Sequence, residues 1–332
     1  MSIHHFEELS SGSSETLVLQ IRWNDARLVI RLQRASSGTG APPLENSFIE
    51  RYNTACRNDD YDEAEALSDE IIHAVVDKGR RMFDQIAPPT GATGSRDLHT
   101  FLFPREYTFR FTTLNENAEL VREDTPATED MLPSPVRVDP SCCLPRYSSR
   151  EIRVLEDLAS NGYIAHVQVD GKEMCSKAGD IKGENAAQRE LDCLWTITKS
   201  GREPVLRVPK LLGLIQTPDE KRIIGFLQEY IPVSDSGELS TLGSIDGPSS
   251  IEAARRKKWA FQIQETVQSL HEMGVVWGDG KASNVLIHRD SDDAWVIDFG
   301  GGWTDGWLSP ELAGTVEGDD AAVAKIFKFL DV

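Results

Sequence analysis

The residues most able to do chemistry lie in one segment, from Val275 to Gly302, where carboxylates alternate with a cation and an amide. Asp279 is followed by Lys281 at i+2 and Asn284 at i+5, and Asp298 comes directly after a short apolar run. A carboxylate can orient a hydroxyl group, and a lysine can neutralise a phosphate. The oxygens of Asn284 and Asp298 suit Mg²⁺ that is shared with nucleotide phosphates. The pattern therefore predicts transfer of a phosphoryl group from a magnesium nucleotide.

The elements around these residues must hold them at the ends of short strands. Residues 255–273 have the spacing of an amphipathic helix, which we expect to lead into the loop of Asp279. The apolar runs 285–287 and 294–297 predict two strands. Ordinary hairpin turns would explain the Asp-Gly pairs, but they leave the order and the spacing of the polar residues unexplained.

In order and spacing these residues resemble two motifs of the protein-kinase superfamily. Asp279-x-Lys281-x-x-Asn284 resembles the catalytic loop, and Asp298-Phe299-Gly300 resembles the metal-binding motif. The resemblance implies ATP and Mg²⁺ as cofactors, Asp279, Lys281 and Asn284 as catalytic residues, and Asn284 and Asp298 as metal ligands. It also implies a two-lobed α+β fold, in which a small lobe built on an antiparallel sheet precedes a helical large lobe.

A nucleotide site of this kind also needs a positioned cation upstream, and the sequence contains a candidate. Residues 163–169 and 173–178 predict two strands joined by a hairpin turn, with Lys177 in the second strand. Glu190 follows within a segment of helical spacing over 184–197. The resemblance implies that Lys177 holds the phosphates and that Glu190 holds Lys177.

The remaining nucleotide contacts are expected in a glycine-rich loop and in the hinge between the lobes. The resemblance places Gln228 at the back of the pocket and residues 229–231 beside the adenine. The glycine-rich loop is degraded: aligned on Val167 it keeps Gly162, whereas serine and alanine occupy the other two glycine positions. The expected nucleotide-binding set is Lys177, Glu190, Gly162, Val167, Glu229, Ile231 and Asp298.

Two further features depart from the superfamily pattern. The residue two positions before Asp279, usually histidine, is Trp277, whose ring nitrogen cannot accept a hydrogen bond. Only 34 residues (332 minus 298) follow Asp298, too few for the helices that form the peptide platform of a full protein kinase. We therefore expect a shortened large lobe, which a partner chain could complete. This resembles compact kinase-like proteins associated with filamentous fungi, and the resemblance covers about residues 151–332.

The expected organisation is an accessory α+β module over residues 1–140, a small lobe with its hinge over 145–232, and a shortened large lobe over 233–332. We assign no role to the accessory module.

Within that module, period-two alternation over 17–23 and 27–32 predicts a hairpin. Residues 60–86 carry an apolar stripe of helical spacing, and residues 101–111 predict another strand. A proline-rich stretch over 126–145 is the expected connector to the next domain.

Composition and charge limit the binding partners and the cellular compartment that we expect for the chain. The net charge of −19 opposes binding to nucleic acid and to anionic membranes, and the sequence lacks an apolar run long enough to span a membrane. Its N-terminal residues lack the pattern of a signal peptide. Five cysteines without metal-binding spacing indicate free thiols in a reducing compartment. We expect a cytoplasmic protein, with the nucleus left open.

Three functional classes remain open at this point. An ATP-dependent kinase acting on a Ser or Thr hydroxyl of a protein is favoured by Lys281 after Asp279 and by Ser309-Pro310-Glu311. A small-molecule kinase resembling aminoglycoside or choline kinases is favoured by the short large lobe and by Gly278. A pseudokinase scaffold is favoured by the degraded glycine-rich loop and by Trp277, although it would have no chemical need for the full set of polar residues. The acceptor is accordingly a protein or a small-molecule hydroxyl.

Overall fold

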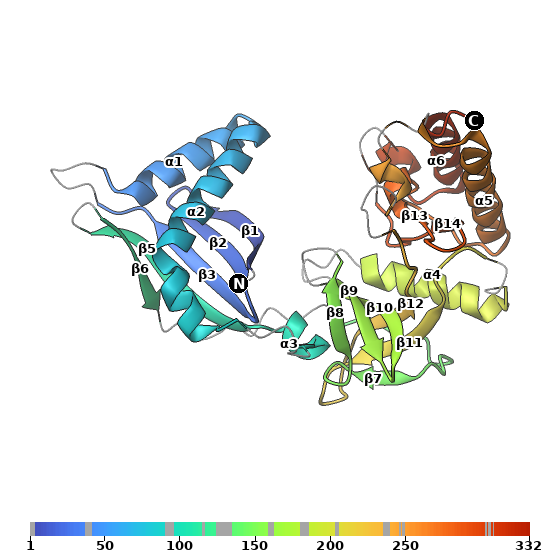
Figure 1. Ribbon diagram of the computed structural model, residues 1–332, viewed down its shortest axis with the longest axis horizontal. Coiled ribbons are helices and arrows are strands. Elements are labelled where there is room, and N and C mark those ends of the chain that lie inside the picture. Colours follow the sequence, from blue (N-terminus) through green and yellow to red (C-terminus); the bar gives the residue numbers. More distant parts are fainter. Residues whose placement is uncertain are drawn as a thin grey trace. The chain divides into compact units, whose positions relative to one another are not determined.

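The computed structural model describes residues 4–36, 42–89, 96–114, 117–123, 135–158, 163–179, 186–202, 206–234, 240–245, 247, 250–302, 304, 307 and 309–332. These residues form two compact units, which are described separately below. The first consists mainly of residues 1–96 and 100–131, and the second of residues 97–99, 132–159 and 163–332. Both units mix helices and strands (Figure 1).

The first unit is a five-stranded sheet with two helices packed on one face (Figure 1). Its strands lie in the order β1-β2-β3-β5-β6, with β3 and β5 parallel and the other neighbours antiparallel. The helices α1 and α2 connect the two parallel strands. The bounds are β1 (His4–Ser13), β2 (Thr16–Trp23), β3 (Ala26–Gln33), α1 (Leu44–Arg57), α2 (Tyr61–Ile86), β5 (Arg105–Leu114) and β6 (Asn117–Glu123).

Alternation along the strands explains the core of this unit. Every second residue of β2, from Leu17 to Trp23, is fully buried against the stripe of α2 that includes Ile71 and Phe83. The predicted hairpin and the predicted helix are both confirmed. The predicted strand over 101–111 is partly wrong, because Phe101 belongs to a short helix, α3 (Leu98–Leu102), and β5 begins at Arg105. Pro104 separates the two elements, since proline lacks the N–H group that would continue a helix.

A seven-stranded sheet forms one part of the second unit, in the order β4-β8-β9-β10-β12-β11-β7. The predicted hairpin is confirmed as β9 paired with β10, and the turn between them places Asp170 and Gly171 at positive φ. The mixed fold is compatible with the kinase-like fold expected from the sequence. The bounds are β4 (Arg96–Asp97), β7 (Arg146–Ser148), β8 (Arg153–Asp157), β9 (Ile164–Val169), β10 (Lys172–Ala178), α4 (Ala186–Ser200), β11 (Leu211–Gln216) and β12 (Ile223–Glu229).

The rest of the second unit is mainly helical and surrounds one short hairpin. Its last long helix begins at Val316, because the side chain of Thr315 accepts a hydrogen bond from Gly318 N and caps the helix. The bounds are η2 (Leu242–Ser244), α5 (Ala253–Glu272), η4 (Ala282–Asn284), β13 (Val285–Ile287), β14 (Ala294–Val296), η5 (Pro310–Leu312) and α6 (Val316–Phe329).

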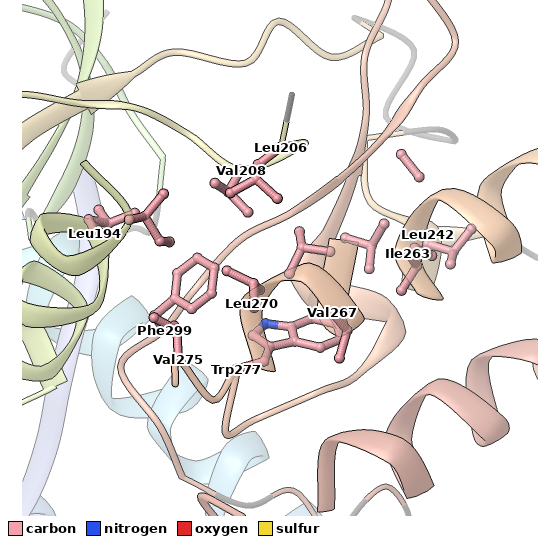
Figure 2. Packing of buried hydrophobic residues seen from close by; sticks show 14 of the residues in the cluster. Leu194, Leu206, Val208, Leu242, Ile263, Val267, Leu270, Val275, Trp277 and Phe299 are labelled. Atoms are coloured by element: carbon pink, nitrogen blue, oxygen red, sulfur yellow. The ribbon is translucent and has the colours of Figure 1, made fainter. Parts of the chain in front are cut away.

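One hydrophobic core joins α4, the sheet and the helical part of the second unit. In the view of Figure 2, Phe299 lies between Leu194 of α4 and Trp277, with Leu270 of α5 beside them. These side chains are almost completely buried. The core therefore fixes the loop before Asp279 and the segment around Asp298 relative to α4. Among the described residues, no helix has the length and apolar character needed to cross a membrane.

Candidate active site

A buried ion pair joins the sheet to α4. Lys177 of β10 donates from Nζ to both carboxylate oxygens of Glu190, at 2.8 Å to Oε1 and 2.6 Å to Oε2. Lys177 is 8% exposed and Glu190 is 3% exposed. A buried carboxylate or ammonium is costly without a partner, so this geometry ties the position of α4 to that of β10.

The charges around the pair keep Lys177 protonated. Burial opposes its charge, but the carboxylates of Glu190 and Asp298 outweigh that effect and raise the pKa of the ammonium above its usual value. Burial raises the pKa of the Glu190 carboxyl, and the charge of Lys177 opposes that rise. The backbone N–H of Phe299, the residue after Asp298, interacts with the Glu190 carboxylate. Asp298 therefore lies near the Lys177–Glu190 pair, and its charge acts on both groups.

The register of the sheet decides which residues share the face of Lys177. Lys177 lies opposite Ile164, and Cys175 lies opposite His166, so these four side chains share one face. Val167 lies opposite Met174 and therefore projects to the other face. This corrects the expected nucleotide contact from Val167, because the period of two sends alternate residues to opposite faces.

The second prediction for this loop, Gly162, falls outside the described residues.

The register of the sheet determines where the predicted hinge residues lie. Gln228 lies opposite Cys175, and hence on the face of Lys177. Its amide nitrogen donates to the sulfur of Cys175 at 3.9 Å, while its buried Oε1 has no partner within the described part of the chain. Glu229 ends β12, with its backbone N–H bonded to Lys210 O at 2.8 Å, and Ile231 is buried just beyond it.

Burial raises the pKa of the Cys175 thiol to about 11, which leaves it protonated and unreactive.

The loop after α5 forms a second polar cluster. Lys281 Nζ donates to Asp279 Oδ2 at 2.7 Å and to Thr304 Oγ1 at 2.9 Å. Thr304 in turn donates to Asp279 Oδ1 at 3.2 Å. Asn284 Nδ2 donates to the backbone oxygen of Asp279 at 2.9 Å. The three predicted catalytic residues therefore meet, and Thr304 joins them as a residue whose role the sequence did not indicate.

Asp298 connects the two groups of predicted residues through the β13–β14 hairpin. Ile297 N donates to Asn284 O at 3.0 Å, which places Asp298 one residue beyond the end of this ladder. Asp298 has a φ of 65°, an uncommon conformation for a residue with a side chain, and its Oδ1 accepts a hydrogen bond from Gly300 N at 3.2 Å. Such backbone conformations cluster at functional sites.

A buried aspartate that no sequence motif marks holds the loop before Asp279. Asp319, 1% exposed in the first turn of α6, accepts hydrogen bonds from Trp277 N at 2.7 Å and Gly278 N at 2.8 Å. His271 Nε2 lies 2.9 Å from its Oδ2. Trp277 itself is fully buried and donates from its ring to Ile297 O at 2.8 Å. The tryptophan therefore links the loop before Asp279 to the segment of Asp298 by packing and by hydrogen-bond donation.

The donor set is suited to a metal ion shared with a phosphate. Asn284 uses its amide N–H group on Asp279, which leaves its carbonyl oxygen as a ligand, and Asp298 offers a carboxylate. Within the described residues there is no group of three His, Cys, Asp or Glu side chains that could hold a metal. An ion held by Asn284 and Asp298 would need further oxygens from phosphates and water, which is how Mg²⁺ is bound at nucleotide sites.

Replacing Asp319 by asparagine tests its supporting role. We expect Asp319→Asn to lower the free energy of unfolding by about 2 kcal/mol, because one buried N–H donor loses a charged acceptor. Chemical denaturation measures this loss. Asp320→Asn is the matched control, since Asp320 is the next residue of α6 and is exposed. Equal stabilities of the two variants would show that Asp319 does not hold the loop.

Comparison with known proteins shows local similarity to kinases. A stretch of 75 residues, 23% of this chain and 20% of the relative, is 39% identical to the glycogen synthase kinase-3 homolog YGK3 of Saccharomyces cerevisiae. A stretch of 121 residues, 36% of this chain and 23% of the relative, is 31% identical to cyclin-dependent kinase F-1 of Oryza sativa subsp. japonica. The chain thus spans about a fifth of the length of the curated relatives it matches. No protein-family model matches the chain. The similarities support a relationship to the protein-kinase superfamily.

Proposed function

We propose that the protein is an ATP- and Mg²⁺-dependent phosphotransferase that transfers the γ-phosphoryl group to a hydroxyl, most readily Ser or Thr of a protein. The observation that carries the proposal is the placement of Asp298. The next residue, Phe299, directs its backbone N–H to the Glu190 carboxylate, so Asp298 lies beside the Lys177–Glu190 pair. The hairpin before Asp298 also holds Asn284 beside Asp279.

The role of each residue follows from the hydrogen-bond donors and the charge that its side chain offers. Lys177 gives two of its three N–H groups to Glu190, which leaves one for a phosphate oxygen. Asn284 and Asp298 would hold the metal. Bound Mg·ATP supplies the phosphoryl group and a cation that neutralises its charge.

Asp279 is held where it can orient the acceptor. Its two carboxylate oxygens are fixed by Lys281 and Thr304, so the side chain is preorganised rather than free to rotate. Lys281 adds a positive charge beside the transfer site. A protein acceptor is favoured because a lysine two residues after the aspartate resembles protein kinases more than small-molecule kinases.

We propose in addition that residues 145–232 and 233–332 are the small and large lobes. Support comes from the order of elements: apart from the two-residue β4, the strands of the seven-stranded sheet, together with α4, fall in the first range. The helices α5 and α6 and the β13–β14 hairpin fall in the second.

Nucleotide binding can be measured by thermal unfolding. Mg·ATP at about 100 times its Kd should raise the Tm by roughly 5–10 °C, because it binds only the folded protein. Asp298→Ala should remove the Mg²⁺-dependent part of this shift through loss of a metal ligand. An unchanged Tm of the parent protein at millimolar Mg·ATP would contradict the nucleotide site.

Phosphoryl transfer is tested separately with Asp279→Asn. This variant should retain the nucleotide-dependent Tm shift but transfer labelled phosphate about 10²–10⁴ times more slowly, because the group that orients the hydroxyl has lost its charge. Asp290→Asn, at an exposed position in the turn of the β13–β14 hairpin, is the control.

The substrates in this assay should be a peptide library and a panel of hydroxyl metabolites. Label in peptides supports the proposal, label in metabolites alone would replace the acceptor class, and label in neither would contradict transfer. Equal rates for parent and Asp279→Asn would remove the role proposed for this aspartate.

A further inference from the structure

The side chain of Arg189, the residue before Glu190 in α4, reaches the backbone of both catalytic segments. A Cβ atom placed on Gly278 would lie 2.5 Å from Arg189 Nη1 and 2.6 Å from its Cζ. A Cβ atom on Gly301 would lie 2.7 Å from the same Cζ. Real Cβ contacts are longer than this, so the guanidinium fills the space that side chains at these two positions would need.

The two glycines are next to the groups that do the proposed chemistry. Gly278 directly precedes Asp279, and Gly301 follows Asp298 by three residues. Their φ angles are 91° and 79°, which glycine adopts without strain. We call the space between them the glycine socket, defined by Gly278 and Gly301.

The contacts of Arg189 are to backbone rather than to an acid. Its Nη2 donates to Val276 O at 3.5 Å. Among the residues that the structure describes, it forms no ion pair with a carboxylate. A flat guanidinium packed on backbone depends on shape as well as charge, and lysine cannot reproduce that shape.

We propose that Arg189 is a positioning residue that couples α4 to the catalytic segments through the glycine socket. This role of Arg189 rests on the proposed function and concerns the positioning of Asp279. Because Arg189 and Glu190 are adjacent in one helix, a shift of α4 that breaks the pair with Lys177 also withdraws the guanidinium from beside Asp279.

A double-mutant cycle tests whether the socket is filled as described. Gly301→Ala should lower the denaturation midpoint of the parent protein, because the added methyl group displaces the guanidinium from its contact with the backbone and places a side chain at a positive φ. In the Arg189→Ala background the same substitution should shift the midpoint by roughly half as much or less, since only the cost of the positive φ remains.

The neighbouring Gly302 provides the control for this cycle. It also has a positive φ, but a Cβ atom added there meets nothing within 4 Å. Gly302→Ala should therefore shift the midpoint equally in both backgrounds. Equal shifts for Gly301→Ala in both backgrounds would overturn the proposal, and this outcome is independent of nucleotide binding.

A kinetic experiment separates positioning from a general loss of structure. Arg189→Lys should lower kcat about tenfold or more, while the Kd for Mg·ATP stays within about threefold, because Lys177 and Glu190 remain paired. Lys199→Met, at an exposed position of the same helix, should leave both values unchanged. Full activity of Arg189→Lys would overturn the proposal. A parent protein that binds no nucleotide would instead contradict the proposed function, and the stability cycle would still decide whether Arg189 fills the socket.

Discussion

The site depends on one constraint: two buried charges, Lys177 and Glu190, must stay within hydrogen-bonding distance of each other. They come from a strand and a helix, and removing one partner of such a pair costs about 3–5 kcal/mol. The structure meets the constraint by packing Leu191 and Leu194 of α4 into the core while β9 and β12 hold β10 on both sides. The helix position is thereby fixed by hydrophobic packing and by charge at the same time.

The loop of Asp279 and the segment of Asp298 are connected to this framework by buried side chains and by backbone hydrogen bonds. Phe299 and Trp277 enter the same core as Leu194, and the buried Asp319 accepts two backbone N–H groups of the loop before Asp279. A histidine is therefore not required at position 277 for packing. The tryptophan fills the core and still forms a hydrogen bond across to Ile297 O. Part of the support for the site thus comes from Trp277 and Asp319, which lie outside the two motifs.

Sequence patterns predicted the local elements well and the long-range contacts poorly. The β9–β10 hairpin and the helix of Glu190 follow from alternation and helical spacing, which are local properties. Alternation also separates the two faces of β9. It does not say which of them lies on the side of the sheet that carries Lys177 of β10, and this is why Val167 was assigned to the wrong face. Asp319 and Arg189 act on segments tens of residues away, so only the three-dimensional arrangement reveals them.

Calorimetric titration of Mg·ATP into the Glu190→Gln variant tests most directly whether the Lys177–Glu190 ion pair organises the site. The substitution keeps the size of the side chain but removes the charge that holds Lys177. We expect the Kd to rise about tenfold or more, which corresponds to at least about 1.4 kcal/mol of lost binding free energy. Asp192→Asn, at an exposed position of the same helix, should bind like the parent protein. An unchanged Kd for Glu190→Gln would contradict the claim that this ion pair organises the site.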